Sequence, residues 1–183
     1  DLDGHVLELI HFPEGKGEPR WQHHGSDLFL GIDHTAIAVS NTDASLALYR
    51  DELGMHIAGA SENYGEEQEH LNNVFGARLR ITSLRAPQGP GIELLEYLAP
   101  RNGRSIPEDT RANDLAHWET LIDFANADAL WADLYKSHVR FISSGVESAN
   151  HLTQFLFADP DGHVIAAVGK SAPQTVAFEG RLP

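Results

Sequence analysis

Two stretches of the chain alternate between apolar and polar residues and then change to helical spacing. Residues 33–53 read DHTAIAVSNTDASLALYRDEL, a short alternating run followed by Asn and Asp and then by Ala and Leu. Residues 116–136, AHWETLIDFANADALWADLYK, have the same plan 83 positions later. Each stretch predicts a strand followed by a capped amphipathic helix.

Three more strand-like runs follow each predicted helix, separated by Gly- and Pro-rich breaks. They are residues 56–60, 78–85 and 91–98 in the first half, and 139–143, 153–158 and 163–168 in the second. Each half therefore predicts the order β-α-β-β-β. An internal repeat of this size indicates an α+β fold made of two tandem βαβββ modules. The polar segment 67–73 (EQEHLNN) is expected to be a loop, with a lid over a site as one possible role.

A second repetition links the start of the chain to its end. Residues 1–6 (DLDGHV) and 159–164 (DPDGHV) are 158 positions apart, and each continues into an apolar run. Asp and Gly predict a tight turn, and the apolar run predicts a strand. We therefore expect residues 1–12 to be the final strand of a preceding module, because the matching strand ends the second module. The other expected parts are a linker at 13–30, modules at 31–110 and 111–170, and a C-terminal tail at 171–183.

Candidate ligands lie near the start of both first strands. His34 shares a strand face with two alanines, which leaves the open space of a binding surface. His117 matches His34 in the repeat, and Glu93 shares a face with Tyr97 on the last strand of the first half. Two imidazoles and a carboxylate are typical of open catalytic metal sites. We predict a metal site of His34, Glu93 and His117; taken singly, each residue also fits an ordinary strand position.

The composition limits the partners and the metal ligands that the chain can use. The formal net charge of −14 and a pI near 5.0 argue against nucleic acid as a partner. The chain has no Cys, so its 11 His with Asp and Glu are the available ligands, a set suited to one divalent Zn, Ni, Mn, Co or Fe ion. No run approaches the roughly 18 apolar residues of a membrane span, and no signal peptide is visible. We expect a cytoplasmic protein without membrane contact.

Several motifs together resemble the vicinal-oxygen-chelate superfamily, which includes glyoxalase I, methylmalonyl-CoA epimerase, extradiol dioxygenases and bleomycin-resistance proteins. They span residues 31–169 and consist of DHTAIAVS, a helix ending YRDELG, GIELLEY, the AHW strand and FADPDGHV. The resemblance implies two βαβββ modules that form a cupped, barrel-like mixed β-sheet with helices outside. It also implies four metal ligands, one from the first and one from the last strand of each module. Carried to this sequence, these positions are His34, Glu93, His117 and residue 166.

The fourth position departs from the family pattern. Family members commonly have D-P-D-G-x-x-x-E, whereas this chain has Ala166 in place of the acid. That acid is both a ligand and a proton-transfer base in glyoxalase-like chemistry, so its loss weakens the case for glyoxalase I or an extradiol dioxygenase. Glu8 has the matching position in the N-terminal copy. Whether Glu8 serves a site in this chain or a separate upstream one stays open.

The function we expect is that of a metal-dependent enzyme of the isomerase or lyase type. A divalent metal would stabilise an enolate-like intermediate of a small carbonyl or carboxylate substrate. Glu119, two residues from His117 on the same strand face, is the candidate catalytic base. Arg80 and Tyr97 are candidates for binding the substrate, Arg80 through paired hydrogen bonds to an anionic group.

Two other functions remain open. The first is a metal-free small-molecule binding protein of the bleomycin-resistance type, which Ala166 favours and the retained ligand candidates disfavour. The second is a vestigial or regulatory module of a dioxygenase-like multi-module protein, which Glu8 keeps open. The resemblance implies a possible homodimer, and the N-terminal repeat implies an upstream module as another possible partner.

Overall fold

The computed structural model describes residues 1–22 and 25–170, and the expected tail at 171–183 lies outside the described residues. The chain divides into two compact units. The first contains residues 1–42, 54–102 and 109–117, and the second contains residues 43–53, 103–108 and the chain from residue 118. Among the described helices, none has the length and apolar character needed to cross a membrane.

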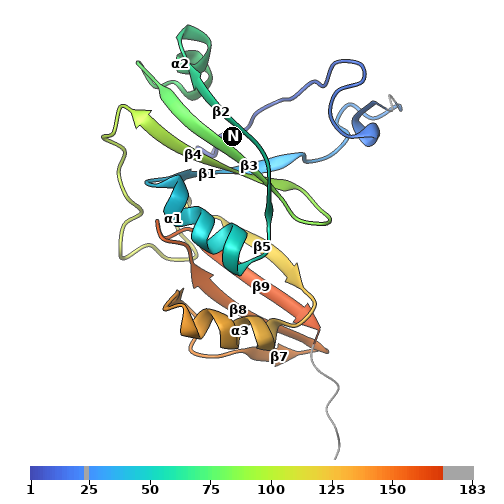
Figure 1. The fold of residues 1–183 in the computed structure, drawn as a ribbon, viewed down its shortest axis with the longest axis vertical. Coiled ribbons are helices and arrows are strands. Elements are labelled where there is room, and N and C mark those ends of the chain that lie inside the picture. Colours follow the sequence, from blue (N-terminus) through green and yellow to red (C-terminus); the bar gives the residue numbers. More distant parts are fainter. Residues whose placement is uncertain (23–24, 171–183) are drawn as a thin grey trace, which may run out of the picture. The chain divides into compact units, whose positions relative to one another are not determined.

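The first unit is built on a four-stranded mixed sheet of order β1-β4-β3-β2 (Figure 1). Strand β1 runs parallel to β4, and the remaining pairs are antiparallel. The alternation in β1 sets its faces, because Ile37 and Val39 are buried whereas Ala36 and Ala38 are exposed. The strands are β1 (His34–Val39), β2 (His56–Tyr64), β3 (Arg78–Arg85) and β4 (Gly91–Ala99).

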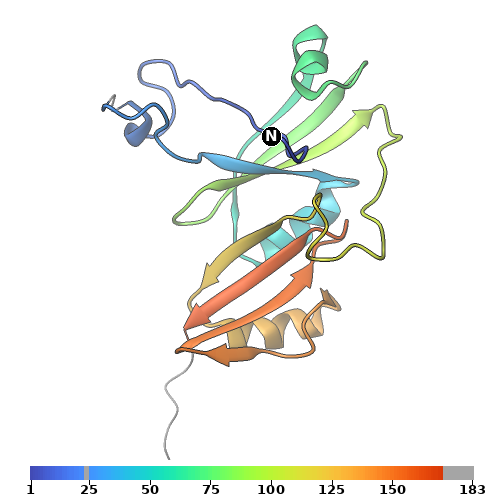
Figure 2. The same ribbon diagram turned by 180° about the vertical axis from the view of Figure 1, so that it is seen from behind.

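The second unit has a mixed sheet of order β5-β9-β8-β6, with β7 paired to β8. Helix α3 (Ala127–Lys136) covers one face of this sheet (Figures 1 and 2). The helix begins after Asn126, whose side chain accepts the Ala129 N–H at 3.0 Å, as an N-cap should. An aromatic cluster fills the space below it, with Trp131 packed edge-on against Phe155 at 5.1 Å. The strands are β5 (Glu119–Phe124), β6 (Arg140–Phe141), β7 (Glu147–Ala149), β8 (Leu152–Ala158) and β9 (Val164–Lys170).

The predicted α+β fold is confirmed. In both sheets the first strand of a module pairs in parallel with its last strand, as β1 does with β4 and β5 with β9. In the part of the chain that the structure describes, two separate mixed sheets are present and neither closes into a barrel. Helix α1 (Thr42–Leu46) continues directly into a π-helix, η2 (Ala47–Glu52), between β1 and β2.

The loop predicted at residues 67–73 is wrong, because this segment is mostly the helix α2 (Glu66–Asn72). Three acidic residues in its first turn favour a helix by interacting with the positive end of the helix dipole. The residue that follows the helix, Asn73, has a left-handed backbone with φ of 52°. Asn tolerates that conformation, so it is a suitable C-terminal residue for a helix. The loop prediction relied on the polar composition of the segment and overlooked these helix-end signals.

The predicted repeat offset of 83 is also wrong. Strand β1 ends at Val39 and its helix begins at Thr42, whereas β5 ends at Phe124 and α3 begins at Ala127. Both modules therefore have the same strand–helix spacing when the offset is 85, which also matches SNTDA with ANADA. With this register, the residue of the second module that corresponds to His34 is Glu119. His117 lies two residues before β5 begins.

The two D-x-D-G copies have the same turn geometry. In the second copy Asp159 Oδ1 accepts the N–H groups of Asp161 and His163 at 2.9 and 2.8 Å. In the first copy Asp1 Oδ1 accepts those of Asp3 and His5, both at 3.0 Å. Gly4 and Gly162 each have a φ of 95°, which only glycine adopts without strain.

The surroundings of the two turns differ. Asp159 is buried and its Oδ2 also accepts the Tyr49 hydroxyl at 3.1 Å, and the turn leads into β9. Burial is the main cause that raises the pKa of Asp159 above its usual value. Asp1 is exposed, and the apolar run after it has no strand partner among the described residues. Val6 and Leu9 are accordingly more than four-fifths exposed.

Candidate functional site

The first unit brings His34 and Glu93 together on the open face of its sheet. His34 is the first residue of β1, and Glu93 lies on β4 directly beside Ala36 in the parallel register. Their side chains meet with His34 Nε2 at 3.4 Å from Glu93 Oε2. Both side chains are largely covered, with 15% and 24% of their surface exposed. The pair is therefore held at a surface that a small molecule or ion can reach.

Asp33 holds the other side of the His34 ring, since His34 Nδ1 lies 2.8 Å from Asp33 Oδ2. Arg85 donates to the same carboxylate oxygen at 2.9 Å and to the Asp33 carbonyl at 2.8 Å. Burial by itself would raise the pKa of Asp33, but the hydrogen bonds from His34 and Arg85 outweigh it and lower that pKa. Asp33 is therefore an anionic acceptor at neutral pH.

This arrangement fits a divalent metal ion. An anionic acceptor at Nδ1 places the proton of a neutral imidazole there, which leaves the lone pair of His34 Nε2 facing Glu93. The Ser83 hydroxyl donates to the other Glu93 oxygen, Oε1, at 2.7 Å and so orients the carboxylate. Two electron-pair donors that face each other attract a cation between them, and imidazole with carboxylate suits the transition metals predicted from the composition.

The remaining predicted ligand and the predicted base lie just before and at the start of β5. His117 precedes β5, and its backbone N–H donates to the Asp114 carbonyl at 2.9 Å. Glu119 begins β5 on an exposed face that it shares with Leu121. Among the residues that the structure describes, no three His, Asp or Glu side chains are arranged to hold a metal ion. The roles assigned to His117 and Glu119 stay predictions.

The two candidates for substrate binding lie on opposite faces of the first sheet. Tyr97 is on the same face as Glu93, four residues along β4, and burial raises the pKa of its hydroxyl. Arg80 is paired in register with Glu96 on the other face, with Nη1 at 3.9 Å from the Glu96 carboxylate. Glu96 is buried and also accepts the Thr42 N–H at 3.1 Å. The structure therefore brings Tyr97, and not Arg80, to the face of the pair.

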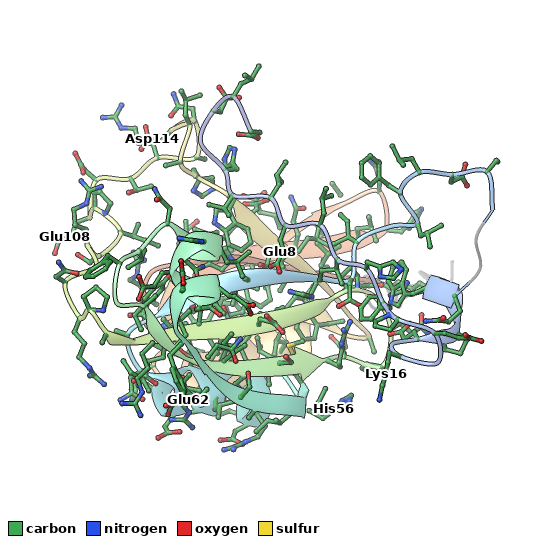
Figure 3. All side chains as sticks on the ribbon, turned by 90° about the horizontal axis from the view of Figure 1, so that it is seen from above. Glu8, Lys16, His56, Glu62, Glu108 and Asp114 are labelled. Atoms are coloured by element: carbon green, nitrogen blue, oxygen red, sulfur yellow. The ribbon has the colours of Figure 1, made fainter. Side chains whose placement is uncertain are left out.

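Glu8, the acid of the N-terminal copy, lies on the exposed segment that precedes the first module. Figure 3 labels it on this segment, together with Lys16 near the 3-10 helix Pro19–Gln22. Its side chain is exposed to solvent. Whether it serves a site stays open.

The corresponding face of the second sheet is mostly apolar. Ala166 is paired with Leu121 on one side and with Leu156 on the other. Leu121 is 64% exposed, although it is a large apolar residue in a regular strand. Glu119 and Asp123 add carboxylates on the exposed face of β5, at the edge of this surface. Such a face is suited to contact with an apolar part of a ligand.

Two surface hollows are lined by residues other than the His34–Glu93 pair. One, of about 450 Å³, is at the far end of the first sheet beside α2, and its wall includes the Arg78 and Glu62 side chains. The other, of about 370 Å³, is in the second unit, beside Asp159 and Arg140. Both are shallow, and neither is lined by His34 or Glu93. The candidate site is therefore identified by the geometry of His34 and Glu93 and not by the presence of a large cavity.

Sequence reasoning missed the residues that support the pair: Asp33, Arg85 and Ser83. Asp33 is adjacent to His34 in the sequence, so the Asp-His dipeptide was a visible signal for an oriented imidazole. Arg85 is 52 positions from Asp33, and only the register of β3 against β4 brings it close. No local pattern identifies that contact.

Comparisons with known proteins agree with this architecture. The sequence model of the Glyoxalase/Bleomycin resistance protein/Dioxygenase superfamily matches residues 31–167. A glyoxalase family protein from Bacillus cereus is 18% identical with a TM-score of 0.71, and the alignment covers 82% of this chain and 100% of that one. A search of curated proteins finds no match.

Two further solved structures have the same fold and different described roles. TnmS3, an antibiotic binding protein from Streptomyces sp. CB03234, is 17% identical with a TM-score of 0.55, covering 79% of this chain and 99% of that one. The trypanothione-dependent glyoxalase I of Leishmania major is 20% identical with a TM-score of 0.54, covering 76% and 86%. At these identities the likeness establishes the fold alone.

Proposed function

Because the chain belongs to the Glyoxalase/Bleomycin resistance protein/Dioxygenase superfamily, we propose that it is an enzyme that binds one divalent metal through His34 and Glu93. His117 remains the predicted third ligand. The metal, when bound, acts as a Lewis acid that stabilises negative charge on oxygen atoms of the substrate. The imidazole and carboxylate donors suit Zn, Ni, Mn, Co or Fe. The substrate class is a small carbonyl or carboxylate compound, and the reaction is of the isomerase or lyase type.

The observation that supports this proposal is the preorganised His34–Glu93 pair. His34 Nε2 and Glu93 Oε2 are 3.4 Å apart, and Asp33 and Ser83 hold the far sides of the two groups at 2.8 and 2.7 Å. Metal-binding histidines usually donate their other ring N–H to a carboxylate in this way. An ordinary surface His–Glu pair does not need such support on both sides.

The chain's own residues would handle the proton and the substrate. Glu119 is the proposed base, because it is an exposed carboxylate on a strand that corresponds to β1. Tyr97, on the Glu93 face, is placed to donate its hydroxyl to a substrate oxygen. Its raised pKa keeps that hydroxyl protonated over the physiological pH range. These assignments give each residue one testable task.

The test is the metal content of the untagged chain, measured by inductively coupled plasma mass spectrometry. We expect about one transition metal ion per chain in the wild type and none in His34→Ala or Glu93→Ala. His117→Ala tests the third ligand separately, and His70→Ala, an exposed His on α2, is the matched control. No metal in the wild type after incubation with Zn, Ni, Mn, Co and Fe(II) would overturn the proposal.

A metal-free small-molecule binding protein is the second candidate. The apolar face around Ala166, Leu121 and Leu156 supports it, because that face lacks the acid that completes the family's ligand set. The test is the binding of an apolar fluorescent probe, 8-anilinonaphthalene sulfonate, to protein treated with EDTA. Binding that is equal with and without metal, and weakened in Leu121→Ser, would support this candidate. Probe binding unaffected by Leu121→Ser would exclude this face.

A further inference from the structure

The segment that precedes the first module folds against the candidate site through one tryptophan. Trp21 lies in the 3-10 helix Pro19–Gln22 and is only 7% exposed, although its sequence neighbours are exposed or half-buried. Phe12 stacks on its ring with centroids 6.1 Å apart, and the Arg20 guanidinium lies 4.1 Å from the ring centroid. Gly31, with φ of 141°, lies beside the indole, where a Cβ would make an ordinary van der Waals contact at 3.4 Å. The ring is therefore held in one place.

The indole N–H of Trp21 has a specific partner. Nε1 donates to Asp33 Oδ1 at 3.1 Å, whereas Arg85 and His34 both contact the other oxygen, Oδ2. The Asp33 carboxylate is thus fixed by groups from three parts of the chain. Its side chain is 12% exposed, so water offers little replacement for a lost donor. Trp21 is the donor that holds Oδ1.

We infer that Trp21 is a positioning residue for the metal ligand His34 and acts through Asp33. By fixing the rotation of the Asp33 carboxylate, it keeps Oδ2 aimed at His34 Nδ1, which keeps the proton on Nδ1 and the lone pair of Nε2 toward Glu93. This inference rests on the proposed function, because it assigns the pair to a metal. It also gives a role to residues 13–30, which the sequence had indicated to be a linker.

The experiment uses Trp21→Phe, which keeps an aromatic ring for Phe12 to stack on and removes the N–H donor together with the indole atoms that face Gly31. Loss of an outer partner of a ligating His typically weakens metal binding by about 10- to 100-fold. Trp21 is one step further away, so we expect about a 10-fold weaker affinity for Zn²⁺, measured by competition with a chromophoric chelator. Trp131→Phe, in helix α3 of the second unit, is the matched control and should leave Zn²⁺ affinity unchanged.

A double-mutant cycle tests whether Trp21 acts through Asp33. Asp33→Asn alone should weaken Zn²⁺ binding more than Trp21→Phe does. In the Asp33→Asn background, Trp21→Phe should have no further effect. A Trp21 effect that persists undiminished in that background would show that Trp21 does not act through Asp33, and the inference would be overturned.

A second readout separates this inference from the proposed function. Nitrogen-15 NMR of the metal-free protein at neutral pH should show His34 as the Nδ1–H tautomer in the wild type and a mixture of tautomers in Trp21→Phe. If the wild type binds no Zn²⁺, the proposed function fails, while the tautomer comparison still tests the positioning role. An unchanged tautomer and an unchanged Zn²⁺ affinity in Trp21→Phe would overturn the inference.

Discussion

The two modules pair their first and last strands in the same register and differ in chemistry at matching positions. Four positions of one module have equivalents in the other. Two are the residue before the first strand and the first residue of that strand. The other two are residues that pair with each other on the last two strands. In the first module these places hold Asp33, His34, Ser83 and Glu93, and in the second they hold Trp118, Glu119, Leu156 and Ala166. The first set has donors and acceptors throughout, whereas the second keeps one carboxylate.

Two modules of the same fold therefore need not contribute equally to a functional site. The support around His34 needs Asp33, and the support around Glu93 needs Ser83. With Trp and Leu at the corresponding places, a ligand pair in the second module would lack both supports. The second module instead presents an apolar surface. The proposed metal ligands His34 and Glu93 therefore lie in the first module, and the second module has apolar residues at the matching positions.

Glu119→Gln tests the one carboxylate that the second module keeps at these positions, and should have the largest effect. A general base typically contributes on the order of 100-fold or more to turnover, so under the proposed role of Glu119 the Gln variant should lose that factor while its metal content stays the same. Steady-state kinetics and elemental analysis check the two parts. Asp123→Asn, on the same exposed strand face, is the control. Loss of metal in Glu119→Gln would instead assign a ligand role, as its correspondence to His34 allows.

Tyr49→Phe should lower the stability of the protein without changing metal binding in the first unit. The variant removes the hydroxyl that donates to Asp159 Oδ2 and leaves a buried acceptor unsatisfied. We expect a loss of about 1–3 kcal/mol in the free energy of unfolding, measured by urea denaturation. Zn²⁺ affinity at 25 °C should not change. An equally stable variant would contradict the structural role of this hydrogen bond.

The double variant Glu119→His/Ala166→Glu copies the His34–Glu93 pair into the second module. It supplies the two ligand types without Asp33-like or Ser83-like support. We expect any new Zn²⁺ site to be at least about 10-fold weaker than the wild-type site, the lower limit for missing outer partners. Isothermal titration calorimetry measures both affinities. Equal affinity at the two sites would show that support by Asp33 and Ser83 is unimportant.

Asp159→Asn should have a smaller effect on the free energy of unfolding, and this effect should depend on pH. Burial raises the pKa of Asp159 in the folded state, so the stability it contributes is present below the unfolded pKa near 3.8 and is lost as pH rises through the folded pKa. Wild-type stability minus that of Asp159→Asn should therefore be larger near pH 4 than near pH 7. The Asn side chain keeps an oxygen for the N–H groups of Asp161 and His163. Urea unfolding across this range checks the sign, and a pH-independent difference would contradict it.

Local patterns predicted the fold well and the site only in part. Strand-like runs between turn signals located β1, β3, β4, β8 and β9, and in β1 the alternation matches the buried and exposed faces. It also placed His34 and Glu93 as ligand candidates, and the structure brings these two together.

The features that sequence reasoning missed depend on register and on distant contacts. Matching the modules by their His residues gave an offset of 83, whereas the helix starts at Thr42 and Ala127 give 85. The Trp21–Asp33 and Arg85–Asp33 contacts join residues 12 and 52 positions apart. No periodic signal records such pairs. The support of the pair therefore became visible only in three dimensions.

The D-x-D-G turn also bears on the order in which the second unit folds. Asp159 Oδ1 and the backbone of the turn close a loop of five residues, through contacts that the exposed turn at Asp1 forms without burial. A hairpin with such a local turn forms in about 1–10 μs. Parallel pairing of β5 with β9 joins residues about 45 positions apart, so its loop closure is slower. We expect the β8–β9 hairpin to form first and to provide the edge onto which β5 docks.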